Sequence, residues 1–117
     1  MKDYKEWIVW QKSMDLVVSM YGVSGAFPKS ELYSLASQIQ RSAVSIPSNI
    51  AEGYVRINSK DKHHFYVISF ASSKELETQL EIARRLKYIN EIDYNRCNEL
   101  LIEVVKLLSK MVFRKID

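Results

Sequence analysis

The 117-residue sequence predicts an all-α protein, a single antiparallel up-down-up-down four-helix bundle over residues 1–117. Apolar residues recur at steps of three and four along four separate segments, which is the period of amphipathic helices. Only 3 Gly and 2 Pro occur, too few for the many turns of a β-sandwich. The links between the four segments are mostly short, and short links join antiparallel neighbours.

Composition indicates a soluble globular protein, with 47% apolar and 26% charged residues. The net charge of +3 is mildly basic and only permits nucleic-acid binding. Cys97 is the only cysteine, which excludes an internal disulfide and favours a reducing compartment. No signal peptide is visible, and no apolar run approaches the roughly 20 residues needed to cross a bilayer. A cytoplasmic protein without membrane contact is therefore expected.

The first helix is expected over residues 7–21. Five apolar side chains follow one another at spacings of 3, 4, 3 and 4, and this stripe is predicted to form a coiled-coil-like contact, in the core or in an interface: Trp7, Trp10, Met14, Val17 and Tyr21. Gly22 and Gly25 are predicted to end the helix. Phe27-Pro28 then marks an irregular connection.

The second helix is expected over residues 31–53, with Ser30 as its N-cap and Gly53 as its C-terminal stop. Its apolar face is predicted to contain Leu32, Leu35, Ala36, Ile39, Ala43, Ile46 and Ile50. Pro47 lies inside this helix, where it removes one backbone donor and clashes with the carbonyl of Ala43. Because the apolar period continues to Ile50, the sequence predicts a bend near Pro47 rather than a break.

A second stripe of small and polar residues runs beside that apolar face, at the same steps: Gln38, Ser42, Ser45, Asn49 and Glu52. An ordinary surface helix backs its apolar face with many charges. A second stripe with few charges predicts a second packing partner for this helix, which indicates a self-associating protein.

The third helix is expected over residues 59–87, capped by Asn58 or Ser59, and the fourth over residues 92–113. A short turn near residues 87–90 makes them antiparallel. Two sets of side chains are predicted to point inward: Phe65, Ile68, Ser72, Leu76, Leu80, Ala83 and Leu86 on the third helix, and Cys97, Leu100, Leu101, Val104, Leu107, Leu108 and Met111 on the fourth.

Polar residues near the second stripe are candidates for a structural polar seam or a subunit interface: Gln38, Arg41, Ser45, Asn49, Glu52, Ser72 and Glu75. Arg41 is predicted to form a forked ion pair with Glu75 on the third helix. Binding of phosphate or of a partner's carboxylate is the alternative. No serine lies in a nucleophile-elbow context, and His63 and His64 are adjacent, so one helix face cannot chelate a metal through both. No catalytic residue, metal or cofactor is expected.

Three basic clusters are candidates for nucleic-acid binding: Arg56, Lys60, Lys62 and His63; Arg84 and Arg85; and Lys106, Lys110 and Arg114. The first stands at the expected start of the third helix, where free N–H groups also favour phosphate. The alternative for all three is ordinary charge placement at helix ends.

Several motifs together resemble a known family: Trp10-Gln11-Lys12, Phe27-Pro28, Gln-Ile-Gln-Arg-Ser-Ala at 38–43, Ser-Ile-Pro-Ser-Asn-Ile-Ala-Glu-Gly at 45–53 and Glu-Leu-Glu-Thr-Gln-Leu at 75–80. The chain resembles the bacterial four helix bundle protein family, whose members were first noticed as reading frames within intervening sequences of 23S ribosomal RNA genes. That family is similar to the accessory protein of diversity-generating retroelements, a ring-like homopentamer that binds a reverse transcriptase and nucleic acid through a basic surface.

The resemblance implies a non-enzymatic homo-oligomer, with a pentamer as the expected assembly, that acts as an RNA- or ribonucleoprotein-associated scaffold. The alternative is a protein-binding adaptor without nucleic-acid contact, such as an accessory subunit of a reverse transcriptase.

Overall fold

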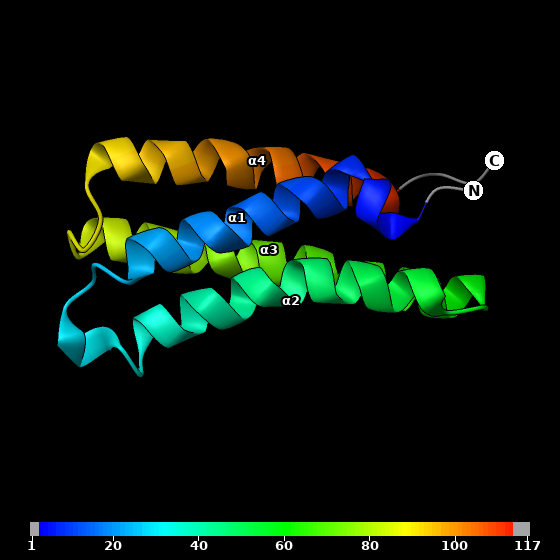
Figure 1. The fold of residues 1–117 in the computed structure, drawn as a ribbon, viewed down its shortest axis with the longest axis horizontal. Coiled ribbons are helices and arrows are strands. Elements are labelled where there is room, and N and C mark those ends of the chain that lie inside the picture. The colour runs from blue at the N-terminus through cyan, green and yellow to red at the C-terminus, as the bar shows by residue number, and fades with distance from the viewer. Residues whose placement is uncertain (1–2, 114–117) are drawn as a thin grey trace.

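The computed structural model describes residues 3–113, and four long helices account for most of them. In chain order these are α1 (Ile8–Ser24), α2 (Leu35–Val55), α3 (Ser59–Arg85) and α4 (Glu91–Phe113), with short 3₁₀ turns η1 (Tyr4–Glu6) and η2 (Lys29–Glu31) before α1 and α2. Successive helices run in opposite directions along a body of 46 × 23 × 21 Å (Figure 1). Because α1 also packs on α4, the four helices enclose one core. The predicted all-α four-helix bundle is confirmed.

The core contains most of the side chains predicted for α2, α3 and α4. Those that are buried as predicted are Leu35, Ala36, Ile39, Ala43, Ile46, Ile50, Ser72, Leu76, Leu80, Ala83, Cys97, Leu101, Val104 and Leu108. Leu32 and Leu86 are exposed, contrary to prediction. Both lie just outside a helix, where the helical period no longer fixes which way a side chain points.

The predicted stripe of α1 is only partly buried. Trp7, Trp10 and Val17 pack against the core, whereas Met14 and Tyr21 are 38% and 48% exposed. The fully covered side chains of α1 are instead Val9, Ser13, Leu16 and Met20. A helix turns by about 100° per residue, so α1 carries two stripes on adjacent sides, and the more apolar one lies at the edge of the core. The inward stripe tolerates Ser13 because its hydroxyl donates to the Trp10 carbonyl at 2.8 Å.

The ends of α1 and α2 differ from the prediction. Helix α1 continues through Gly22 to Ser24, and Gly25 is its C-cap. Helix α2 begins at Leu35, so Ser30 is not its cap but lies in η2. The Glu31 carboxylate instead accepts a long hydrogen bond, 3.4 Å, from the backbone nitrogen of Leu35. The predicted cap of α3 is confirmed, because Asn58 Oδ1 accepts from the Lys60 backbone nitrogen at 2.8 Å.

Gly53 does not end α2, which continues to Val55. A methyl group at Gly53 would lie 2.6 Å from Cε1 of Tyr66 and 3.2 Å from the carbonyl oxygen of Lys62. The glycine therefore allows α3 to approach α2 closely, next to the turn that joins them. Helix α2 also remains helical through Pro47, and the bend there stays a prediction.

Candidate functional site

The polar residues between α2 and α3 form a hydrogen-bonded seam. The hydroxyl oxygens of Ser45 and Ser72 are 2.8 Å apart, and Asn49 Nδ2 donates to both the carbonyl and the hydroxyl oxygen of Ser45, at 2.8 and 2.9 Å. Buried Ser69 donates to the Ile46 carbonyl at 2.8 Å. Ser45–Ser72 and Ser69–Ile46 thus join α2 to α3, whereas Asn49 bonds within α2 and holds the Ser45 side chain in place.

Gln79 is a seam residue that the sequence reasoning missed. The Ser42 hydroxyl lies 3.0 Å from the Glu75 carboxylate and 2.9 Å from the side-chain amide of buried Gln79. Both partner atoms, Glu75 Oε1 and Gln79 Oε1, are acceptors, and a hydroxyl has one hydrogen, so Ser42 donates to one of the two at a time. The spacing along the sequence could have identified Gln79, because it follows Glu75 by one helical turn and so lies on the same face of α3.

The predicted Arg41–Glu75 ion pair is wrong. Arg41 is exposed, and no carboxylate of residues 3–113 lies within 4.0 Å of it. Adjacent helical positions point about 100° apart, and it is Ser42 that faces α3 and meets Glu75. Glu52 also lies outside the seam, because it pairs with exposed Arg56 at 2.9 Å. Gln38 is exposed and makes no side-chain hydrogen bond within the described chain.

The seam is a satisfied packing arrangement. In the part of the chain that the structure describes, no buried side-chain nitrogen or oxygen lacks a hydrogen-bond partner. Each such group would cost about 1–3 kcal/mol if it lost its partner. These hydroxyls and amides therefore hold α2 against α3.

Most side chains of the first basic cluster bind other groups of the protein at the end of the bundle where α2 meets α3. Lys62 Nζ donates to the carbonyls of Tyr54 and Gly53, at 2.6 and 3.3 Å, and so caps the C-terminus of α2. The Arg56 guanidinium lies 4.6 Å from the centre of the Phe65 ring as well as on Glu52. His63 Nε2 is 3.0 Å from the Val112 carbonyl of α4. Lys60 remains exposed, and no carboxylate of residues 3–113 pairs with it.

The second cluster is neutralised by acids at the opposite end of the bundle. Arg84 lies 3.2 Å from Glu91 and 3.6 Å from Glu81, and Arg85 lies 2.9 Å from Glu81. The Arg85 hydrogen bond holds the pKa of the Glu81 carboxyl below its usual value. Burial, together with a 3.1 Å hydrogen bond to Glu81, raises the pKa of Tyr94.

The third cluster is the most open one. Lys106 and Lys110 are exposed one turn apart on α4, and neither pairs with a carboxylate of residues 3–113. Arg114 lies outside the described residues. The contact between His63 and Val112 joins the start of α3 to the end of α4, so the first and third clusters share one end of the molecule.

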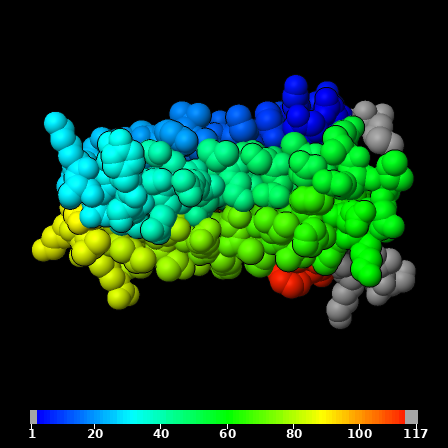
Figure 2. Space-filling view, turned by 90° about the horizontal axis from the view of Figure 1, so that it is seen from below, coloured from blue at the N-terminus to red at the C-terminus, as the bar shows by residue number. Residues whose placement is uncertain are grey.

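The outer side of the α1–α2 pair carries a groove. Two adjoining hollows of about 370 and 570 Å³ share Val44 and Ser48, and together they form what we call the α1–α2 groove. One half is mainly apolar and is lined by Tyr4, Trp10, Met14, Val17, Val44, Pro47, Ser48 and Ala51. The other half, which we call the polar half because most of its lining residues are polar, is lined by Tyr21, Ser37, Gln40, Arg41, Val44, Ser45, Ser48 and Asn49. In Figure 2, α2 crosses the molecule between α1 and α3. The residues that line the groove come from η1, α1 and α2.

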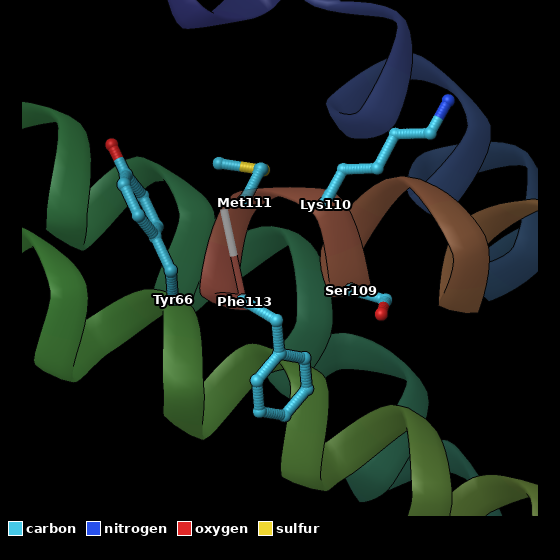
Figure 3. A pocket seen from close by; sticks show the side chains of 5 residues that line it. All are labelled: Tyr66, Ser109, Lys110, Met111 and Phe113. Atoms are coloured by element: carbon cyan, nitrogen blue, oxygen red, sulfur yellow. The ribbon is translucent and has the colours of Figure 1, made fainter. Parts of the chain in front are cut away.

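A further hollow lies beside the end of α4, lined by Tyr66, Ser109, Lys110, Met111 and Phe113. Figure 3 shows that these side chains diverge: Phe113 and the Tyr66 hydroxyl point to opposite sides, and Lys110 extends away from both. The groups do not converge on one point, so this hollow is not arranged to hold a small ligand.

Two further findings concern residues 3–113. No three His, Cys, Asp or Glu side chains gather there as a metal site would require. None of these helices is long and apolar enough to cross a membrane.

Comparison with known proteins places the chain in a family. The sequence model of the 23S rRNA-intervening sequence protein family matches residues 5–110, so the chain belongs to that family. A solved structure of a protein of unknown function from the S23 ribosomal protein family of Bacteroides thetaiotaomicron VPI-5482 is similar, at 26% identity and a TM-score of 0.84. The similarity covers 91% of this chain and 99% of that one. No curated protein matches the chain.

Proposed function

We propose that this protein is a non-enzymatic, self-assembling scaffold that works with RNA or ribonucleoprotein. The observation that carries the proposal is the second stripe of α1, whose side chains Trp10, Met14 and Val17 are only partly covered by the core and line the groove on the outer side of the α1–α2 pair. A surface helix usually presents charged residues at such positions. A contiguous apolar groove on the outside of a small domain is characteristic of a protein–protein contact.

Assembly multiplies the small positive charge of the chain. A charge of +3 on one chain becomes about +15 on a closed ring of five copies, the size that we propose. Lys60, Lys106 and Lys110 share one end of the bundle and have no carboxylate partner in the described chain. Repeated around a ring, these lysines form a multivalent surface for a phosphate backbone.

Light scattering coupled to size-exclusion chromatography tests the assembly, and the ratio of absorbance at 260 and 280 nm across the peak reports bound nucleic acid. A mass that is a multiple of 13.7 kDa is expected. A mass of one chain at all concentrations refutes self-assembly.

A mobility-shift titration with a hairpin RNA, repeated at increasing salt, tests RNA binding. We expect affinity to fall steeply with salt, since phosphate contacts release counterions. The double variant Lys106→Glu/Lys110→Glu should lose at least about tenfold in affinity, because charge repulsion replaces two phosphate contacts in every copy. Lys87→Glu, an exposed charge reversal on the turn after α3, is the control. If both variants bind like the wild type, these lysines do not contact RNA.

A protein-binding adaptor without nucleic-acid contact is the second candidate. The observation in its favour is that acids or backbone carbonyls already engage Arg56, Lys62, Arg84 and Arg85. An oligomer that shifts no RNA at low salt would support the adaptor over the RNA scaffold.

A further inference from the structure

The α1–α2 groove holds a cation that lacks a partner. Arg41 lines its polar half, is exposed, and has no carboxylate of residues 3–113 within 4.0 Å. Its neighbours Ser37, Gln40 and Asn49 in the groove are neutral. The other half of the groove is mainly apolar. An occupant that satisfies both halves is a helix with an aliphatic side chain at one level and a carboxylate at another.

The outer face of α1, beside the groove, carries both aliphatic side chains and a carboxylate. Ile8 and Val18 are 62% and 70% exposed. Asp15 lies between them, exposed, and no cationic group within residues 3–113 is close enough to pair with it. Seven residues bring a helix almost back to the same angle, so Ile8 and Asp15 share one row, with Val18 a turn further on.

The spacing of these groups matches the groove. Ile8 and Asp15 are seven residues apart on α1, and Ser48 and Arg41 are seven residues apart on α2. At 1.5 Å per residue both distances along the helix axes are about 10 Å. A second α1 that runs antiparallel to α2 therefore brings Asp15 to Arg41 and Ile8 to the apolar half of the groove.

We propose that the outer face of α1 in one copy docks in the α1–α2 groove of the next copy, where Asp15 pairs with Arg41. This inference rests on the proposed self-assembly and assigns its interface. The docked face and the groove are different surfaces of the chain, so the contact is heterologous. A heterologous contact repeats from copy to copy until the rotation closes a ring.

Charge reversal tests the ion pair in the full-length protein. Arg41→Glu and Asp15→Arg should each place like charges together and reduce the solution mass toward the 13.7 kDa of one chain. The double variant Arg41→Glu/Asp15→Arg should regain the wild-type mass. Lys87→Glu, an exposed cation on the turn after α3 and outside the groove, should keep that mass and serves as the charge control. Far-UV circular dichroism checks that each variant is folded.

An apolar pair of variants tests the groove itself. Val44 in the groove and Ile102 on α4 are similarly exposed, at 39% and 41%. Val44→Glu should abolish assembly, whereas Ile102→Glu should leave the mass unchanged. Both residues are partly exposed, so neither variant removes a fully buried core side chain.

The outcomes separate this inference from the proposed function. A wild-type protein that stays monomeric overturns the proposed function and this interface together. An oligomeric wild type whose mass is unchanged in Arg41→Glu, Asp15→Arg and Val44→Glu overturns only the interface. If both single charge reversals dissociate the oligomer and the double variant does not restore it, the Asp15–Arg41 pairing is overturned.

Discussion

The close approach of α3 to α2 at Gly53 makes a quantitative prediction about stability. Gly53 and Gly22 each stand two residues before the last residue of a helix, so Gly→Ala brings a similar gain in helix propensity at both, up to about 1 kcal/mol. A methyl group at Gly22 has no atom outside its own turn within 4 Å, whereas one at Gly53 meets Cε1 of Tyr66 at 2.6 Å. The difference between the two variants therefore isolates the packing cost.

Overpacking of this kind typically costs about 1–3 kcal/mol. The same methyl group would also lie 3.2 Å from the carbonyl oxygen of Lys62, a backbone atom that cannot rotate away, so movement of the half-buried Tyr66 ring alone does not relieve the crowding. We expect Gly22→Ala to be slightly more stable than the wild type. Gly53→Ala should be less stable than Gly22→Ala by about 1–3 kcal/mol.

Urea unfolding followed by far-UV circular dichroism measures this difference, at one fixed subunit concentration because assembly also contributes to stability. Repeating Gly53→Ala in a Tyr66→Ala background should remove most of the cost, leaving only the contact with the Lys62 carbonyl. Equal unfolding midpoints for Gly53→Ala and Gly22→Ala would refute the packing argument. An unchanged cost in the Tyr66→Ala background would show that the Tyr66 ring is not its source.

Three further predictions concern single side chains. Asn58→Ala removes the cap of α3 and should lower the unfolding free energy by about 1 kcal/mol, whereas Asn58→Ser should retain most of it in the same urea assay. The pKa of the Glu81 carboxyl is lowered in the folded state, and the largest cause is its hydrogen bond with Arg85. The ionised carboxylate therefore stabilises the fold at pH values above the pKa of the unfolded chain. This stabilisation disappears as the pH falls through the pKa of the folded state. Glu81→Gln should therefore lower the melting temperature at pH 7 and make less difference at acid pH, and an equal effect at both would contradict the linkage. Cys97 is 1% exposed and burial raises its pKa, so its thiol should react with Ellman's reagent only after unfolding, and rapid reaction of the native protein would refute its burial in the core.

Local rules succeeded wherever one segment contained the deciding information. The faces of α2 and α4 followed from a single dominant apolar stripe, and Asn58 was identified as a cap from residue type and position. They were incomplete on α1, which has two stripes of similar length. The apolar period indicated Trp10 and Met14, which are only partly covered or exposed, but the fully buried stripe includes Ser13, since this hydroxyl bonds within its own helix.

The seam and the basic clusters depended on partners that a single segment does not contain. Arg41 and Ser42 are adjacent, and only the rotation of α2 against α3 decides that Ser42 meets Glu75. The same holds for Arg84, which the sequence presents as free cationic charge and the bundle pairs with Glu91 of α4.

The number of helices, their order and the apolar face of α2 were encoded in the spacing of residues along the chain, because amphipathic period and capping are local properties. The orientation of each helix about its own axis is a property of the packed bundle. It decides that the more apolar side of α1 is only partly covered, that Gly53 supports a close contact and that Arg41 remains without a carboxylate partner in the described chain. Burial and ion pairing are settled between helices, where the free energy of packing selects one rotation among several that the sequence pattern allows.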